Sequence, residues 1–155
     1  MKLVTLILAL LYGLFVLVIF PLVFIKTNDY FSFPIYSNSL IKYLGIVLII
    51  LGGLFWFYCI NLFFFIGKGT PVPINPPKKI IVNGLYKFSR NPMYVSTLVI
   101  LFGYLLVFGR ILLLIYLFLD FLFLNLFIVL YEEPTLKRKF GKDYFNYCNK
   151  VPRWL

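Results

Sequence analysis

The sequence predicts an all-α membrane protein, a polytopic helical bundle of about four spans, from three observations. The first is composition: 63% of the 155 residues are hydrophobic and 13% are charged, against about 45–50% and about 25% in a typical soluble domain. The second is a set of four apolar stretches near the length of a membrane span. The third is the concentration of Lys and Arg in two polar segments. A soluble globule of this size could not bury so much apolar surface, so soluble and disordered classes are excluded.

The four expected spans cover residues 3–25, 43–66, 92–109 and 111–131. A hydrocarbon core of about 30 Å needs about 20 helical residues, so the third span is short. The first span begins with Met-Lys, as a signal peptide does, but its length and its lack of a small-residue cleavage site predict a retained anchor. Gly52-Gly53 suits close contact between the second span and a neighbouring helix. Only Gly109-Arg110 separates the last two spans, which predicts a tight helical hairpin.

Positive charge predicts the orientation of the bundle. The loop of residues 67–91 carries five Lys and Arg and the tail after Tyr131 carries six, whereas the loop of residues 26–42 carries two. Because Lys and Arg favour the cytoplasmic side, we expect both rich segments and both termini to be cytoplasmic. The polar segments are too short for a second domain, so residues 1–155 are expected to form a single domain. Without a targeting segment, such a chain suits a prokaryotic inner membrane.

The tail is expected to form a cytoplasmic amphipathic C-terminal helix, in which Gly141 is a candidate break. Its lysines and its first arginine fall mainly on other faces, where they would meet lipid phosphates. A basic tail that only anchors the protein would carry the same pattern. The apolar residues that recur at helical spacing are Leu136, Phe140, Tyr144, Tyr147 and Val151.

The residue types that are missing exclude several kinds of chemistry. The sequence contains no histidine, which excludes Ser-His-Asp and Cys-His catalysis and every His-ligated metal site. Cys59 lies in an apolar stretch and Cys148 in the basic tail, so neither a metal cluster nor a structural disulfide is expected. We therefore expect no metal. Nucleic acid is not an expected partner either, because the basic tail also carries the apolar face of a membrane-surface helix.

Two adjacent acids, Glu132 and Glu133, follow the last span. Acids at a helix C-terminus meet the negative end of the helix dipole, which costs about 0.3–1 kcal/mol each. The nearby bilayer adds a desolvation cost. A cation is therefore expected beside them. Arg90, a lysine of the tail and a cationic ligand are all open as that partner, and more than one of them can apply.

A further acid, Asp120, lies inside the last span, about 18 Å along the helix from Glu132. An ionisable residue within a span indicates function by default, but a tyrosine, Asn61 or Asn125 would equally satisfy it within the bundle. An alternative class is a non-catalytic membrane protein, such as a transporter or an accessory subunit. The same polar positions would then line its pathway through the membrane. Against that class, the polar residues concentrate at one cytoplasmic rim rather than along a midplane route.

Five short motifs follow one another in the second half of the chain. They are Gly84-Leu85-Tyr86, Arg90-Asn91-Pro92-Met93-Tyr94, Glu132-Glu133-Pro134-Thr135-Leu136, the run from Phe140-Gly141 through Tyr144 to Tyr147, and Val151-Pro152. In this order around a helical hairpin, from about Gly67 to Arg153, they resemble the integral-membrane family that includes isoprenylcysteine carboxyl methyltransferases and phospholipid N-methyltransferases. Arg-Asn-Pro-Met also resembles a bacterial branch of that family.

The resemblance implies S-adenosylmethionine as the methyl donor, bound on the cytoplasmic side by residues 67–94 and 131–153 without a Rossmann domain. It implies a lipophilic or lipidated acceptor that enters sideways from the bilayer, and it leaves the oligomeric state open. Glu132 would meet the amino-acid end of the donor, which supplies the missing cation. Arg90 and Glu133 are the predicted catalytic residues. The cofactor-binding residues carried over by position are Lys79, Ile80, Ile81, Val82, Tyr86, Asn91, Pro92, Met93, Tyr94 and Glu132.

Two positions depart from the family pattern. Asn91 stands where the family usually has His, and Ile128 stands where the carboxyl methyltransferases have an Arg that contacts the acceptor. Asn forms hydrogen bonds but is no base near neutral pH. Transfer to a carboxylate needs no base, whereas an amine must first lose a proton. The expected acceptor is therefore the carboxylate of an isoprenylcysteine-like or other lipid acid. The alternative is N-methylation of a phospholipid of the phosphatidylethanolamine type.

Overall fold

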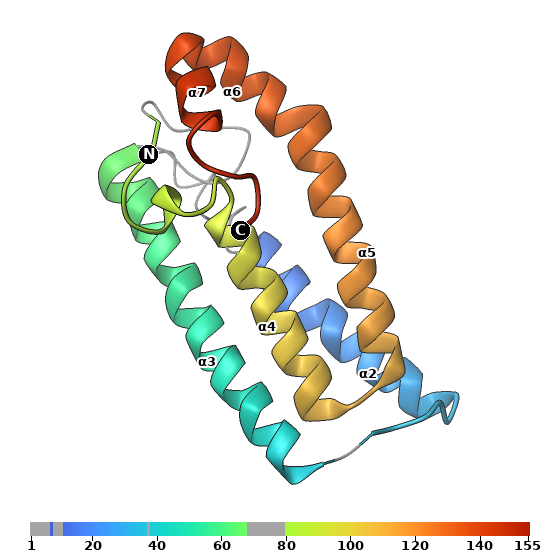
Figure 1. The fold of residues 1–155 in the computed structure, drawn as a ribbon. Coiled ribbons are helices and arrows are strands. Elements are labelled where there is room, and N and C mark those ends of the chain that lie inside the picture. The colour runs from blue at the N-terminus through green and yellow to red at the C-terminus, as the bar shows by residue number, and fades with distance from the viewer. Residues whose placement is uncertain (1–6, 8–10, 37, 68–79) are drawn as a thin grey trace.

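The computed structural model describes residues 7, 11–36, 38–67 and 80–155. Part of the predicted first span lies outside the described residues, and so does Lys79 among the predicted cofactor-binding residues. The turns η1, η2 and η4 are π-helical and η3 is a 3₁₀ turn. The helical elements in chain order (Figure 1) are η1 (Phe15–Ile19), α2 (Phe20–Tyr30), α3 (Ser39–Leu62), η2 (Phe63–Gly67), η3 (Gly84–Lys87), α4 (Pro92–Phe108), α5 (Ile111–Phe127), η4 (Ile128–Glu132), α6 (Glu133–Phe140) and α7 (Lys142–Cys148).

Three continuous helical stretches are long and apolar enough to cross a membrane, namely Leu11–Tyr30, Ser39–Leu62 and Ile111–Phe140. Pro92–Phe108 is a shorter apolar helix. These helices run alternately in opposite directions within one bundle (Figure 1). The described residues contain no β-strand. The predicted class, an all-α polytopic membrane bundle with a helical hairpin at α4 and α5, is confirmed.

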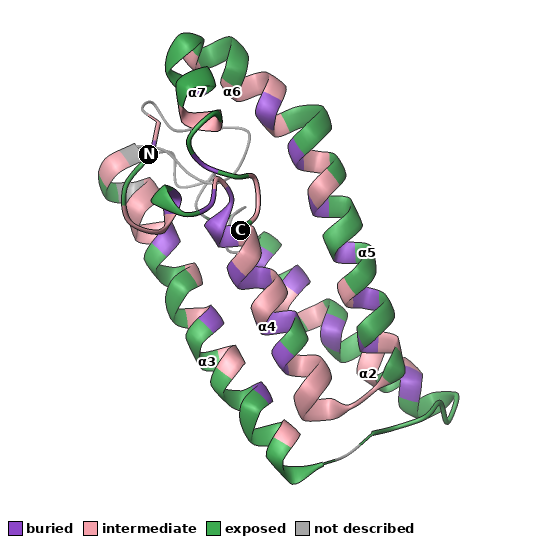
Figure 2. Cartoon of the chain, in the orientation of Figure 1, coloured by how far each residue is buried: buried purple, intermediate pink, exposed green. Residues whose placement is uncertain are grey.

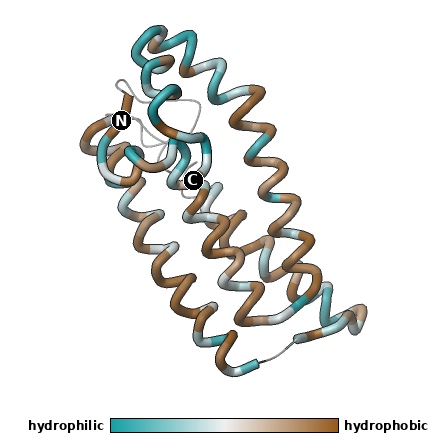
Figure 3. Tube along the Cα trace, in the orientation of Figure 1, coloured by the Kyte–Doolittle hydropathy of each residue, from teal (hydrophilic) through white to brown (hydrophobic). Residues whose placement is uncertain are grey.

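The last continuous helix is longer than a membrane span requires. At 1.5 Å per residue, the 30 residues of Ile111–Phe140 reach about 45 Å, whereas about 20 residues cross the hydrocarbon core. We take residues 111–130, about 20 residues, as the membrane-spanning part of this helix, so Glu132 and Glu133 follow it. Figure 3 shows hydrophilic residues gathered at this end, around α6, α7 and the C-terminus. We call this end, made by residues 80–91 and 131–155, the charged end.

Glycines allow α3 and α4 to pack closely. A Cβ atom added to Gly45 would lie 2.8 Å from the Gly103 carbonyl oxygen, and one added to Gly103 would lie 2.8 Å from the Gly45 carbonyl oxygen. A Cβ on Gly52 would lie 2.7 Å from the side chain of Ile100. Membrane helices associate through such close packing, because lipid provides no hydrophobic force between them. Of the predicted pair, Gly52 makes this contact and Gly53 faces open space.

The hairpin between α4 and α5 turns at Gly109, whose φ of 61° lies in the left-handed region. A Cβ atom there would overlap the carbonyl oxygen of Tyr36. The Tyr36 N–H donates to the Gly109 carbonyl at 2.8 Å, so the turn is tied to the connection between α2 and α3. Only glycine satisfies both the backbone angle and this close approach.

The first described span ends at Tyr30, five residues beyond the predicted end at residue 25. Its last turn is stabilised by polar contacts with the hairpin. Asp29 accepts two hydrogen bonds of 3.1 Å from Arg110. Asn28 is fully buried. Its side-chain amide donates to the Phe33 carbonyl, and its side-chain oxygen accepts from the Leu112 N–H at the start of α5. The next span begins at Ser39 because the Asn38 side chain accepts from two N–H groups of the first turn.

Many apolar side chains on the spans face outward. Figure 2 shows α3 exposed along most of its length, whereas buried residues concentrate on α4, which lies between α3 and α5. A broad exposed apolar surface is suited to lipid contact and is rare on soluble monomers. The exposed apolar surface therefore agrees with the membrane protein that the composition predicts.

The amphipathic tail forms two short helices rather than one. Gly141, with φ 53° and ψ −124°, ends α6 immediately before α7. Tyr144 and Val151 of the predicted apolar face are 4% and 8% exposed, so this face packs against the protein. The basic residues Lys137, Arg138, Lys139 and Lys142 are exposed.

Candidate functional site

The charged end is built where the last helix changes its winding. The π turn η4 ends at Glu132, two residues before Pro134. Proline has no N–H to donate to the carbonyl four residues earlier, so a wider turn is favoured at this point. Successive helical residues project about 100° apart. Glu132 and Glu133 therefore reach different partners, although they are adjacent in the chain.

Glu133 is 6% exposed and is paired with two arginines. Arg153 donates from Nε to Oε1 at 2.8 Å and from Nη2 to Oε2 at 3.2 Å. Nη1 of Arg90 lies 3.0 Å from Oε1. Burial alone would raise the pKa of Glu133, but the hydrogen bonds from Arg153 and the charge of Arg90 hold that pKa below its ordinary value. Glu133 is therefore ionised and fixes the position of both guanidinium groups.

Glu132 has a different environment. The Tyr94 hydroxyl donates to its Oε2 at 2.9 Å, and no Lys or Arg among the described residues forms an ion pair with it. Burial raises the pKa of Glu132 to about 7, with the Tyr94 hydrogen bond opposing the shift and the charge of Glu133 adding to it. A cation placed beside this carboxylate would favour its ionised form. Of the partners that the sequence left open, arginine applies to Glu133, whereas no Lys or Arg of the described residues is paired with Glu132.

The C-terminal segment after α7 folds back over the start of α4 (Figure 1). The Arg90 N–H donates to the Pro152 carbonyl at 2.9 Å. The side-chain amide of Asn91, which is 7% exposed, donates to the Arg153 carbonyl at 2.9 Å. Asn91 thus ties the start of α4 to the same segment that delivers the Arg153 guanidinium to Glu133.

An apolar cluster lies beside these polar contacts. Ile81, Tyr86 and Met93 are buried together against Cys59 of α3. Burial raises the pKa of Tyr86 well above its ordinary value, so its hydroxyl is neutral. The hydroxyl of Tyr147, on α7, donates to the Tyr86 carbonyl at 2.7 Å. The cluster therefore connects α3, the segment before α4 and α7 into one wall.

The predicted site residues thus fall into three groups. Tyr94 meets Glu132, Arg90 meets Glu133, and the apolar members join the cluster. Of the remaining predicted cofactor-binding residues within the described part, Pro92 is buried at the start of α4, Ile80 is partly buried and Val82 is 43% exposed.

Sequence reasoning missed Arg153 as the bidentate partner of Glu133. Its position directly after Val151-Pro152, as the last cation of the chain, was the available signal. It also missed Cys148, whose sulfur lies 2.9 Å from Nη1 of Arg90. No pattern links these residues in advance, because they meet only when the C-terminal segment folds back.

Asp120 is not satisfied by either asparagine that the sequence suggested. Asn61 donates its side-chain amide to the Phe57 carbonyl, and Asn125 accepts from the Trp154 indole. Asp120 is 7% exposed, and its buried Oδ2 has no hydrogen-bond partner in residues 11–36, 38–67 and 80–155.

The apolar spans, the tight hairpin and the acid–arginine contacts at one end define an integral membrane protein with its polar site at the end of the bundle. A family model described as phospholipid methyltransferase matches residues 40–143, about two thirds of the chain. The chain belongs to this family, as the motifs indicated, and is a membrane methyltransferase. Searches of curated proteins and of solved structures found no significant match.

Proposed function

We propose that the protein transfers a methyl group from S-adenosylmethionine to the carboxylate of a lipophilic acid. One observation carries the proposal. Glu133 is paired with two arginines, whereas its neighbour Glu132 is held by Tyr94 and has no Lys or Arg partner among the described residues. A partly buried carboxylate without a cation favours a cationic ligand. S-Adenosylmethionine is such a ligand, because its amino group and its sulfur both carry positive charge.

The residues around Glu132 fit this donor. Its carboxylate would accept from the donor ammonium group, and the Tyr94 hydroxyl holds that carboxylate in place at 2.9 Å. Tyr86 and Met93 offer a buried apolar wall at the same end of the bundle. When bound, the donor supplies a methyl group on a positively charged sulfur.

Arg90 is the residue that we propose for the acceptor. Its Nη1 contacts Glu133 and the Cys148 sulfur, whereas its buried Nε has no hydrogen-bond partner within the described part of the chain. A buried cationic donor without a partner suits an anionic oxygen. Glu133 is then a positioning residue, because its ionised carboxylate sets the orientation of the Arg90 guanidinium.

This arrangement requires no general base. A carboxylate oxygen is already anionic, so the rate depends on aligning oxygen, methyl and sulfur and on removing water from the charges. The side-chain amide of Asn91 is engaged with the Arg153 carbonyl and holds the site together. In this proposal the charged end faces the cytoplasm of a prokaryotic cell, where the soluble donor is available.

A phospholipid amine is the second candidate acceptor, and the description of the matched family favours it. Arg90 would then hold the lipid phosphate. The amine must lose a proton before it attacks, and Glu132, whose pKa is about 7, is the group at the charged end that suits this task. The two candidates therefore assign different roles to Glu132.

Product chemistry tests the proposal. Purified protein in nanodiscs would receive methyl-tritiated S-adenosylmethionine with either a farnesylated cysteine analogue or phosphatidylethanolamine, and heat-denatured protein would serve as the control. Base releases a methyl ester as volatile methanol, whereas an N-methyl group stays with the lipid. We expect base-labile label on the acid. Base-stable label on phosphatidylethanolamine alone would overturn the carboxylate acceptor.

A further inference from the structure

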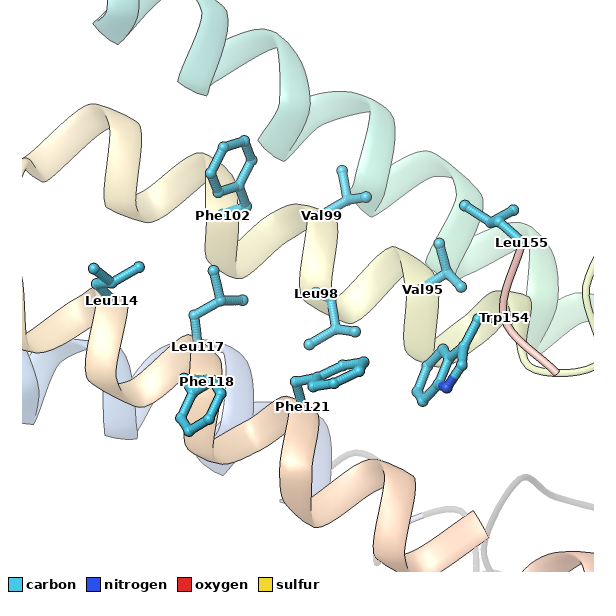
Figure 4. A pocket seen from close by; sticks show the side chains of 10 residues that line it. All are labelled: Val95, Leu98, Val99, Phe102, Leu114, Leu117, Phe118, Phe121, Trp154 and Leu155. Atoms are coloured by element: carbon cyan, nitrogen blue, oxygen red, sulfur yellow. The ribbon is translucent and has the colours of Figure 1, made fainter. Parts of the chain in front are cut away.

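An apolar groove of about 490 Å³ lies between α4 and α5 (Figure 4). The polar atom among its side chains, the indole nitrogen of Trp154, donates to Asn125 Oδ1 at 3.3 Å. The groove therefore offers its occupant carbon surface and no unsatisfied side-chain hydrogen-bonding group. Its lining residues are Val95, Leu98, Val99, Phe102, Leu114, Leu117, Phe118, Phe121, Trp154 and Leu155.

The groove exists because α4 contacts its two neighbours unequally. Glycines bring α4 tightly against α3, whereas α4 and α5 share a much smaller contact. The C-terminal segment enters between them, and the Trp154 ring packs on Phe121 with centroids 5.4 Å apart. Figure 4 shows Trp154 and Leu155 at one end of the groove, with Leu98 of α4 and Leu117 of α5 between the two helices.

The chain connects the groove directly to the charged end. Val95 lines the groove, and the preceding residue, Tyr94, binds Glu132. Trp154 also lines it, and the preceding residue, Arg153, binds Glu133. The groove-lining residues Val95 and Trp154 therefore directly follow, in the chain, the residues that bind the two acids.

The charges at this end favour an anionic head group. Arg90 and Arg153 share the carboxylate of Glu133, so the carboxylate of Glu132 makes the four side chains neutral together, and the cationic donor that we propose for Glu132 would leave the cluster positive. The buried Nε of Arg90 has no hydrogen-bond partner among the residues that the structure describes. A cationic cluster next to an apolar slot matches an amphiphile with an anionic head and a hydrocarbon chain.

We propose that this groove binds the hydrocarbon chain of the methyl acceptor, an amphiphile with one chain in the groove and an anionic head group at Arg90. The inference rests on the proposed function and adds the binding site of the acceptor chain.

Photolabelling tests the groove on the whole protein. The probe is a long-chain fatty acid that carries a diazirine in its distal half, added to the protein in nanodiscs and mapped by mass spectrometry. We expect the label on groove residues of α4 and α5. Label spread evenly over the lipid-facing residues would show ordinary membrane lipid contact and overturn the inference.

Matched tryptophan variants sharpen the test. Leu117→Trp fills the groove from α5, whereas Leu119→Trp places the same side chain on an exposed position of the same helix, 51% exposed and outside the groove. We expect Leu117→Trp to reduce groove labelling by about tenfold, since roughly two methylenes lose their place, and Leu119→Trp to leave it unchanged. Leu98→Trp, from the opposite wall, replaces Leu117→Trp if that variant fails to fold. Unchanged labelling in the folded groove variant would contradict the inference.

Two further measurements separate the parts of the inference. A fatty amine of the same length should label the groove much less than the acid, and equal labelling would overturn the anionic head group. Calorimetry with S-adenosylhomocysteine tests the donor site independently. Donor binding without groove labelling would overturn only the claim that the groove binds the acceptor chain. Groove labelling without donor binding would overturn the proposed function.

Discussion

Replacing Glu132 by Gln removes one negative charge while keeping the shape of the side chain. In the wild type the carboxylate is fixed by the Tyr94 hydroxyl at 2.9 Å and has no Lys or Arg partner among the described residues. If it receives the donor ammonium, the substitution removes a hydrogen bond to a charged group, worth about 1.5–3 kcal/mol. The dissociation constant of the donor should then rise by about 10- to 150-fold.

Calorimetry with S-adenosylhomocysteine, which keeps the ammonium group, measures this loss. Tyr94→Phe removes only the hydroxyl that orients Glu132, so affinity should fall by about 2- to 12-fold, in line with a neutral hydrogen bond. Thermal unfolding of each variant shows whether the fold is kept. A folded Glu132→Gln protein that binds the donor as tightly as the wild type would refute the placement of the ammonium at Glu132.

Three other predictions follow from the same contacts. Donor affinity should rise with pH through about 7 and level off above it, because only ionised Glu132 attracts the ammonium; calorimetry about one unit below that pKa should give about tenfold weaker binding, and a flat profile would exclude this role. Glu133→Gln leaves two arginines without their shared carboxylate, so the free energy of unfolding should fall by about 3–5 kcal/mol in denaturant titration, and a loss below about 1 kcal/mol would contradict the pairing. Gly109→Ala should destabilise the protein by at least about 1–2 kcal/mol, since φ is 61° and a Cβ would overlap Tyr36, whereas Gly53→Ala, which faces open space, should not; equal unfolding temperatures for the two variants would contradict the account of the hairpin.

The membrane architecture was accessible from the sequence because it depends on composition along the chain. Apolar stretches near the span length predicted the helical bundle, and the short Gly109-Arg110 connection predicted the hairpin. Helix ends were less accessible. The first span continues to Tyr30 because Asp29 meets Arg110 of the distant hairpin, a contact that hydropathy does not contain.

The site was partly accessible for a related physical reason. The need for a cation was inferred from an acid pair at a helix end, but the helix continues to Phe140, so the dipole reason was wrong and the burial of Glu132 and Glu133 is what requires compensation. Which cation meets which acid depends on the winding of the helix at η4 and on the return of the C-terminal segment. Arg153 was therefore not identified. The same holds for the contact of Gly45 with Gly103, because it depends on how two helices are rotated relative to each other.

The central claim is that Glu132 receives the cationic amino-acid end of the methyl donor. A structure of the protein with bound S-adenosylhomocysteine tests it most directly. We predict that the ligand lies at the charged end, with its ammonium nitrogen within about 3.2 Å of a Glu132 oxygen and its sulfur facing the Arg90 side of the site. A ligand bound elsewhere on the protein, or one whose ammonium group contacts other residues and leaves Glu132 without a cation, would contradict the account.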